Sequence, residues 1–369
     1  MGSTDADAVD TLLALTSDLV AIPSHEDPTR AGDRLEAWLR EETDARVERD
    51  EVGNVIARRG SGETLALVGH HDVVAPADGQ LEPDGTCTVE HRNGRLYGRG
   101  TADMKGALAA MALAFRDADP PGELAFASFV GEETGGEGCR HALEEGFAPP
   151  YAIVGEGSTD YSAADVSDVV VAHKGRRGST IIAEGRAAHA SEPERGENAI
   201  YRACEAVEHL RDLAPPTAPV PTADATMQGS VVVTEIEGGD AWNVIPDRCT
   251  VTVDERTVPG ERVDASAVAD ATGVDWRVDQ DLPPMACGDE AFVAAALTAA
   301  DDAQEGTPRP VTKHHATDAG WLADTGVSCL ILGPAEPGEA HTDTESVSVA
   351  ALDRCRRIYA AIASNWPSG

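Results

Sequence analysis

The sequence predicts an α/β fold with a parallel sheet, interrupted by a second, smaller domain. The chain has 369 residues, which exceeds the usual size of a single hydrophobic core. In residues 1–173, apolar strand patterns alternate with helical patterns, and from residue 174 the pattern changes to the alternation typical of antiparallel strands with one solvated face. We therefore expect a discontinuous main domain of residues 1–173 and 286–369 and an inserted α+β domain of residues 174–285.

Helical and strand patterns alternate through the first part of the chain. Apolar residues at three-to-four-residue spacing predict helices over 5–21 and 30–42, and an alanine-rich segment predicts a third over 107–115. Apolar or alternating runs between turn residues predict strands at 45–52, 55–58, 65–68, 123–130 and 151–154. The last three runs are almost wholly apolar, which is typical of buried strands in a parallel sheet.

The inserted segment and the end of the chain contain a second set of elements. Alternating residues predict antiparallel strands at 175–183, 229–236 and 249–253, with helices at 198–210 and 264–271. The proline-rich stretch 215–221 is expected to be a loop. After residue 289 the helical and strand patterns resume, with a buried strand at 328–332 and a closing helix at 349–365.

The charge balance is strongly acidic, with 29 Lys and Arg against 65 Asp and Glu and a net charge of −36. Such a chain repels nucleic acids and anionic membrane surfaces, so neither is an expected partner. The acidic residues are spread along the whole chain, as in proteins that stay soluble in molar salt. We interpret the charge as a sign of a halophilic habitat.

Cysteine usage and the N-terminal segment bear on location. The seven cysteines are scattered and include no Cys-x-x-Cys pair, which favours reduced thiols over a zinc ribbon or a dithiol redox site. The acidic first ten residues lack the basic region of a signal peptide, and no apolar run approaches the roughly 18 residues of a membrane span. The expectation is a cytoplasmic protein.

Side chains that can bind metal stand where predicted strands end or a predicted helix begins. They are His70, Asp72, Asp103, Glu132, Glu133 and Glu156. Taken singly, each has an ordinary explanation, since His70-x-Asp72 fits a polar turn and Asp103 fits a helix cap. Together they would converge on the carboxyl edge of one parallel sheet, where binding sites of α/β proteins lie. So many charged groups in one place require a cation.

Zinc is the cation that this set of donors suits. Imidazole nitrogens and carboxylate oxygens are its usual ligands, and the candidates here are His70, Asp103, Glu133, Glu156 and His341. Two ions can be held if Asp103 bridges them, with Co²⁺ able to substitute, and a shared water would then be acidified. Glu132 can act as the general base toward that water, and Asp72 can orient the ring of His70.

Five ordered motifs carry a resemblance to a known family: Gly69-His70-x-Asp72, Tyr97-Gly-Arg-Gly-x-x-Asp103-Met-Lys-Gly106, Gly131-Glu-Glu-x-Gly, Gly155-Glu156 and Ala340-His341-Thr. They resemble the co-catalytic zinc aminoacylase and carboxypeptidase family, which includes acetylornithine deacetylase and succinyl-diaminopimelate desuccinylase. The resemblance implies a three-layer αβα catalytic domain with two zinc ions and an inserted α+β domain through which many members form homodimers. It assigns His70, Asp103 and Glu156 to one zinc, and Asp103, Glu133 and His341 to the other.

The inserted domain contains further matches to the family. His189 resembles the histidine that crosses the dimer interface and stabilises the oxyanion, and Asn243 and Arg256 resemble residues that meet the substrate carboxylate. Arg176 and Ser179, in Gly175-Arg-Arg-Gly-Ser179, resemble a stretch that contacts the succinyl group in the desuccinylases. By contrast, the segment from His314 to Asp318 departs from the family's Gly-Thr-Ser-Asp loop, which leaves substrate contacts there open.

The resemblance implies a zinc-dependent amidohydrolase. The expected reaction is hydrolysis of an N-acyl amino acid, foremost N-succinyl-LL-diaminopimelate to succinate and diaminopimelate in lysine biosynthesis. Acetylornithine, another N-acyl amino acid and a dipeptide or carboxypeptidase substrate remain alternatives. A nucleotide-binding protein is disfavoured, because the glycine-rich segments fit neither G-x-G-x-x-G nor a P-loop. A catalytically silent binding module is disfavoured because Glu132 and every proposed ligand are present.

Overall fold

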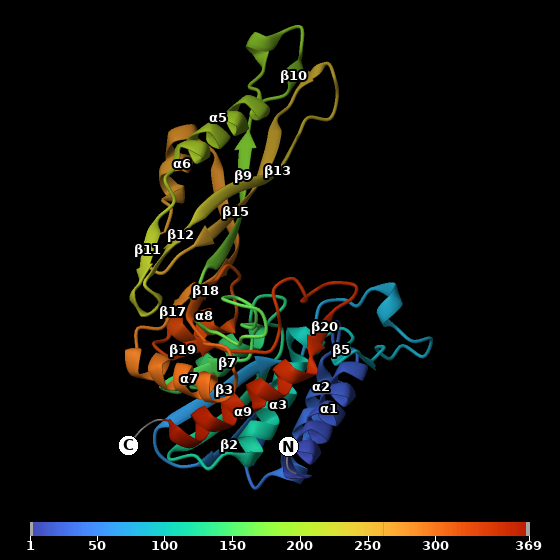
Figure 1. Cartoon of the computed structure of the whole chain (residues 1–369). Helices are drawn as coiled ribbons and strands as arrows, with labels where there is room; N and C mark the ends of the chain where they lie inside the picture. The colour runs from blue at the N-terminus through green and yellow to red at the C-terminus, as the bar shows by residue number, and fades with distance from the viewer. Residues whose placement is uncertain (1–2, 261, 367–369) are drawn as a thin grey trace.

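The structure has a body and an elongated arm, and both chain ends lie in the body (Figure 1). It is a computed structural model that describes residues 3–260 and 262–366. The body contains a nine-stranded sheet in the order β1-β2-β6-β3-β7-β19-β8-β17, with β18 also paired to β8. The strands are β1 Arg46–Arg49, β2 Val55–Gly60, β3 Thr64–His70, β6 Glu123–Phe129, β7 Tyr151–Val154, β8 Val169–His173, β17 Met285–Ala286, β18 Pro310–Lys313 and β19 Ser328–Ile331.

The centre of this sheet is parallel. β3 pairs in parallel with both β6 and β7, and β19 pairs in parallel with β7. The pairs β1–β2, β2–β6, β19–β8 and β8–β17 are antiparallel, so the complete sheet is mixed. The carboxyl ends of β6, β3 and β7 therefore meet at one edge, as the sequence predicts.

Helices cover both faces of the sheet, which gives the expected three-layer αβα body. Leu65 and Leu67 of β3 belong to one core, and Ala66 and Val68 of the same strand belong to the other. The first core is formed with α1 Ser3–Ala21, α2 Thr29–Glu42, α3 Gly106–Asp117, α7 Glu290–Asp302 and α9 Val349–Asn365, and the second with α4 Glu137–Glu144 and α8 Asp318–Asp324. No helix in the described ranges has the length and apolar character needed to cross a membrane.

The arm is an antiparallel α+β unit. Its four-stranded sheet has the order β13-β15-β9-β16, formed by β9 Gly175–Glu184, β13 Ser230–Gly238, β15 Arg248–Thr257 and β16 Asp275–Leu282. Buried and less buried residues alternate along β15, so one face is packed and the other is solvated. The packed face lies against α5 Ala199–Asp212 and α6 Ala265–Thr272. At the far end, β10 Ala188–His189 pairs with β14 Val244–Ile245.

The proline-rich segment is a β-hairpin and not the loop that the sequence suggests. Among the described residues, β11 Thr217–Val220 pairs with β12 Ala225–Gln228 and with no further strand, so Pro219 costs the sheet no interior hydrogen bond. Ala218, Val220 and Met227 join the main core of the body. The hairpin thereby fastens the arm to the body.

A small sheet joins two segments that are far apart in sequence. It has the order β20-β5-β4, with β4 Glu90–Arg92, β5 Arg95–Tyr97 and β20 Ser346–Ser348. β5 leads toward Asp103, and β20 follows soon after His341. This pairing brings the two segments together beside the carboxyl edge of the main sheet.

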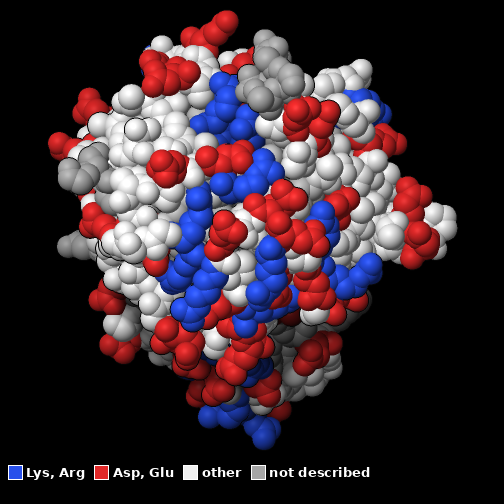
Figure 2. All heavy atoms as spheres, turned by 90° about the horizontal axis from the view of Figure 1, so that it is seen from below, with Lys and Arg blue, Asp and Glu red and all other residues white. Residues whose placement is uncertain are grey.

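The body's surface mixes charges of both signs. Viewed from below, Arg and Lys side chains gather in a band that is flanked and interrupted by Asp and Glu (Figure 2). Basic residues on this face thus lie among carboxylates, which agrees with the acidic balance of the whole chain.

Candidate active site

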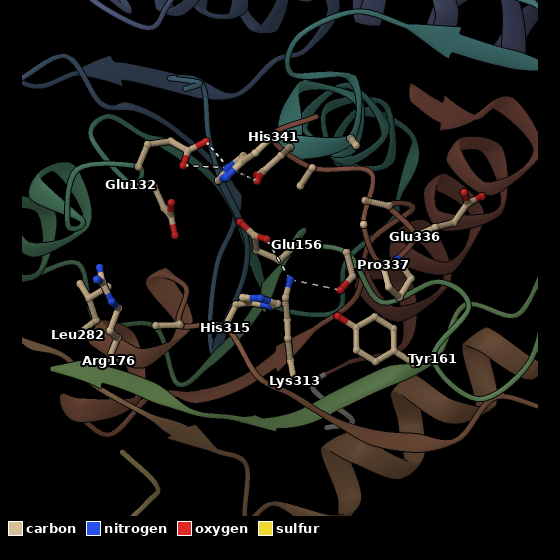
Figure 3. A pocket seen from close by; sticks show the side chains of 18 of the residues that line it. Glu132, Glu156, Tyr161, Arg176, Leu282, Lys313, His315, Glu336, Pro337 and His341 are labelled. Carbon is tan, nitrogen blue, oxygen red and sulfur yellow. Dashed lines mark hydrogen bonds and ion pairs between the residues drawn. The ribbon is translucent and has the colours of Figure 1, made fainter. Parts of the chain in front are cut away.

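The metal-binding candidates converge at the carboxyl edge of the main sheet (Figure 3). His70 is the last residue of β3, Glu132 and Glu133 follow β6, and Glu156 follows β7. Asp103 lies in the segment Thr101–Lys105 directly before α3, and its own backbone is not helical, with φ −128° and ψ 95°. His341 comes from a loop after β19 and has a φ of 65°, a left-handed conformation that non-glycine residues adopt rarely.

Asp103 lies between two imidazoles and faces each with a different oxygen. Its Oδ1 is 3.1 Å from His70 Nε2, and its Oδ2 is 3.1 Å from His341 Nε2. The second partner of His70 Nε2 is Glu156 Oε1 at 3.4 Å, and that of His341 Nε2 is Glu133 Oε2 at 3.2 Å. Each imidazole nitrogen therefore meets Asp103 and one further carboxylate, which is the arrangement expected of a carboxylate that bridges two cations.

The electrostatics of these groups favour positive charge. Burial lowers the pKa of His70, but the carboxylates of Asp103, Asp72 and Glu156 outweigh it and raise that pKa well above its usual value. Hydrogen bonds to Asp103 and Glu133 raise the pKa of His341 to about 10. Carboxylates that hold a proton on an imidazole will also hold a divalent cation in its place. His70, Asp103 and Glu133, and likewise His70, Glu132 and Glu156, offer ligand atoms within 4.8 Å of one another, so the donors fit metal ions.

Glu132 is half-buried beside these groups, and its side chain points into the cavity (Figure 3). Burial raises its pKa well above the usual value for a glutamic acid; His70 opposes this shift, and the negative charges of Glu156, Asp318 and Asp103 add to it. A carboxylate that accepts a proton readily and faces a cavity has the properties of a general base.

The cavity in front of the cluster has a volume of about 400 Å³ and is bounded by both domains. Arg176, Gln280 and Leu282 of the arm form one wall. Tyr161, Lys313, His315 and the segment from Ala335 to His341 belong to the body. A small polar substrate could reach the carboxylate cluster here and touch the arm at the same time.

Comparison with known proteins assigns the family. The sequence model described as peptidase family M20/M25/M40 matches residues 66–365, which is most of the chain. The chain belongs to this family. It is therefore a metallohydrolase of the M20 type, and its αβα body with an inserted dimerisation-type domain is the architecture of this family.

Individual relatives of this M20 protein have more than one activity. It is 32% identical to a succinyl-diaminopimelate desuccinylase of Alkalilimnicola ehrlichii over 349 residues, covering 86% of this chain and 88% of the relative. It is 30% identical to an acetylornithine deacetylase of Pectobacterium carotovorum over 332 residues, covering 84% and 82%. Aminopeptidase PepT from Bacillus cereus superposes with a TM-score of 0.77 at 22% identity, covering 96% and 98%. The YXEP protein of Bacillus subtilis, a dinuclear metal-binding M20 peptidase, has a TM-score of 0.68 at 18% identity, covering 97% and 98%.

Asp72 contacts both the ring of His70 and the loop of Glu132 and Glu133 in this M20 protein. The Nδ1 atom of His70 lies 3.0 Å from the backbone oxygen of Asp72 and 3.6 Å from its carboxylate. Both groups of Asp72 therefore face this ring nitrogen, the carbonyl at the shorter distance. The carboxylate accepts the backbone N–H groups of Glu132 and Glu133, at 3.4 and 3.2 Å, so it holds the loop that carries these two residues.

The expected substrate-binding residues fall into three places. Arg176 lines the cavity and is held by Asp254 and Gln280 at 2.8 and 2.9 Å. Arg256 lies opposite Arg176 in the sheet and binds the same Asp254. Ser179 is buried on the other face, with Ile181, because residues three apart on a strand point in opposite directions. Ser179 does not line the cavity of its own chain, and its contact with a substrate stays a prediction.

His189 and Asn243 are remote from the cluster within one chain. His189 belongs to β10 at the far end of the arm (Figure 1), where its Nε2 atom lies 3.4 Å from Asn243 Nδ2. His189 Nδ1 also accepts a hydrogen bond from the backbone N–H of Ser191. The two side chains are thus adjacent to each other and exposed, but they do not line the cavity of their own chain.

The departing loop contributes residues that the sequence did not assign. Lys313, just before this loop, and His315 both line the cavity, whereas His314 does not. Asp318, the first residue of α8, is buried, and burial raises the pKa of its carboxyl to about 7. His71, between His70 and Asp72 in the sequence, is fully buried and bonds Ser128 Oγ at 2.8 Å. Burial lowers the pKa of His71 to about 3, so its ring is neutral.

Glu345 supports the loop of Asp103 and was not identified from sequence. Its Oε1 accepts the backbone N–H groups of Gly100, Ala102 and Asp103 at 3.0, 2.9 and 3.1 Å. Its Oε2 pairs with Arg99 at 2.6 Å, and both side chains are almost fully buried. This carboxylate ties the segment of Asp103 to the segment that follows His341. The motif Tyr97-Gly-Arg99-Gly contained an indication of such a carboxylate, because an arginine that is buried needs an anionic partner.

Replacing Glu345 by glutamine is expected to lower metal affinity about 10- to 100-fold. The amide oxygen can still accept backbone hydrogen bonds, but Arg99 loses its buried counter-charge and the Asp103 loop loosens. Zinc titration against a competing chelator measures the affinity. Glu339→Gln is the matched control, because Glu339 lies in the same segment but contacts Arg95 and Ser346. Equal affinities in the two variants would contradict this role.

Proposed function

We propose that this M20 protein hydrolyses the amide bond of N-succinyl-LL-diaminopimelate, releasing succinate and diaminopimelate. The observation that carries the choice is Arg176, which lines the cavity from the stretch that resembles the desuccinylases. A guanidinium suits a carboxylate such as the end of a succinyl group. The relative of 32% identity named as a desuccinylase supports the same choice. Acetylornithine is the second candidate, since a deacetylase is 30% identical.

Two zinc ions would be held by His70, Asp103 and Glu156 and by Asp103, Glu133 and His341. The support is the position of Asp103, which offers one oxygen toward each imidazole. When bound, such ions make a water molecule acidic near neutral pH and polarise the substrate carbonyl. Cobalt, which accepts the same ligands, would replace zinc.

Side chains of the protein would then transfer the proton, hold the catalytic loop and orient the substrate. Glu132 takes a proton from the attacking water as oxygen bonds to the acyl carbon, and returns that proton to the leaving nitrogen as the C–N bond breaks. Asp72 keeps Glu132 and Glu133 in place by accepting their backbone N–H groups. Arg176 binds the distal carboxylate and thereby orients the amide.

The inserted arm would complete the site by pairing two copies of the chain. β13 is an edge strand of the arm sheet, and Val232 and Ile236 on it are 51% and 48% exposed. Trp242 and Val244, near His189, are also exposed. An exposed edge strand with apolar side chains favours pairing with another chain. In a homodimer His189 could reach the partner's cavity and bind the oxyanion. Sedimentation of the protein in molar salt measures the oligomeric state.

A substrate screen tests the proposed reaction. N-succinyl-LL-diaminopimelate, N-acetylornithine and a dipeptide are compared in molar salt with zinc or cobalt, before and after dialysis against a strong chelator. We expect the succinyl substrate to have the highest kcat/KM, and its hydrolysis to disappear on dialysis and return with either metal. Preference for another substrate would refute the desuccinylase assignment alone. A rate of hydrolysis that changes neither on dialysis against the chelator nor on addition of metal would refute the metal-dependent mechanism.

A further inference from the structure

Lys313 is a buried cation in direct contact with one of the proposed metal ligands. It is the last residue of β18, and its Nζ atom donates to Glu156 Oε2 at 3.1 Å. A weaker contact to the backbone oxygen of Gly157 is 3.4 Å long. The two side chains are only 9% and 11% exposed. Figure 3 shows the ammonium group pointing at Glu156 from below the cluster.

The two oxygens of Glu156 consequently have different partners. Oε1 faces His70 Nε2 at 3.4 Å, on the side of the metal candidates, and Oε2 faces Lys313. A carboxylate can bind a cation through one oxygen or through both. Because the ammonium of Lys313 already occupies one oxygen with a charge-assisted hydrogen bond, only Oε1 is turned toward the cluster.

Glu156 pairs with a lysine, whereas most other paired carboxylates of the chain pair with arginine. The protein has only three lysines, Lys105, Lys174 and Lys313, among 29 basic residues. Most other carboxylates that pair with a cation pair with arginine, as in Arg176–Asp254 and Arg99–Glu345. Lysine is a compact point charge that fits beside one oxygen, whereas the arginine fork tends to engage both oxygens of a carboxylate.

We propose that Lys313 is a positioning residue that makes Glu156 a ligand through Oε1 alone and so keeps a coordination position free on that metal. The inference rests on the proposed ligand role of Glu156. An open position is what separates a catalytic metal site from a closed structural one. Without the ammonium, Glu156 can turn both oxygens to the metal and occupy the position that water or substrate needs.

Cobalt spectroscopy tests this role without any substrate. Lys313→Met removes the charge and the donor but keeps a side chain of similar length, and Lys174→Met makes the same change outside the cluster. The d–d absorption of cobalt weakens as its coordination number rises. We expect Lys313→Met to bind cobalt with a weaker spectrum and to lose about 10- to 100-fold in kcat. Lys174→Met should match the wild-type protein in both.

The outcomes separate this inference from the proposed function. An unchanged spectrum in Lys313→Met, with only KM raised, would overturn it and make Lys313 a substrate contact. A wild-type protein that binds no cobalt would overturn the metal-dependent function itself. Should Lys313→Met fail to fold, a crystal structure of the zinc-loaded wild-type protein decides: Oε1 alone within about 2.0–2.2 Å of zinc supports the inference, and both oxygens at that distance overturn it.

Discussion

Glu132→Gln is expected to lower kcat by about 10²- to 10⁴-fold while leaving the metal content unchanged. Glutamine has nearly the same shape but cannot take a proton from water. The side chain of Glu132 is half-buried beside the cluster and points into the cavity. The loss of water around its carboxyl is the main cause that raises its pKa, so it is suited to accept that proton. Steady-state kinetics with metal analysis of the same sample separates the loss of a base from the loss of a ligand.

The control for this substitution is Glu137→Gln, five residues further along. Glu137 begins α4 and is exposed, so the same chemical change there should alter neither kcat nor metal content. If Glu132→Gln lost metal together with activity, Glu132 would be a ligand. This alternative has a physical basis, because Glu132 can join His70 and Glu156 around one ion. Near-normal turnover would remove Glu132 from the mechanism altogether.

Transfer from molar to low salt is expected to remove about 5 kcal/mol or more of the free energy of unfolding, which is much of the stability of a typical protein. The net charge is −36, so repulsion among carboxylates opposes the compact state. The Debye length is about 3 Å at 1 M salt and increases to about 30 Å at 0.01 M, so at low salt the carboxylates repel one another over longer distances. The exposed arginine pairs, such as Arg34–Asp18, strengthen at low salt but contribute only about 0–1 kcal/mol each.

Denaturant unfolding at a series of potassium chloride concentrations measures this dependence. A neutral osmolyte is the control, because sucrose stabilises compact states without screening charge. If sucrose at low salt restored all the lost stability, the effect would not require screening. A free energy of unfolding that is independent of salt would refute the interpretation of the acidic composition as an adaptation to salt.

Local pattern was sufficient for many elements of the fold. The apolar runs before His70, Glu132 and Glu156 are strands, and the polar residues at their ends meet at one edge because parallel strands share a direction. Other elements were missed because their pattern is weak. β8 stands after a loop without periodicity, α4 has only eight residues, and β11 contains Pro219, which normally argues against a strand.

A residue of the candidate site could be predicted where a single sequence motif is enough to identify it. Asp103 and His341 could be named from their motifs, but that His341 lies 3.1 Å from Asp103 depends on the pairing of β20 with β5. The substrate contact expected of Ser179 stays a prediction, because proximity in sequence does not show which face of a strand a residue occupies. Arg176 and Ser179 are three residues apart and point to opposite sides.

By itself, the sequence determined the family, the alternation of strands and helices, and the side chains available for the metal cluster, since these depend on residue type and spacing along the chain. Only the tertiary structure decided the partners of those side chains: Lys313 on Glu156, Glu345 on the loop of Asp103, and the Asp72 carbonyl on His70. The first two contacts join segments more than 100 residues apart. Whether such groups meet depends on strand order and register, which spacing within one motif does not encode.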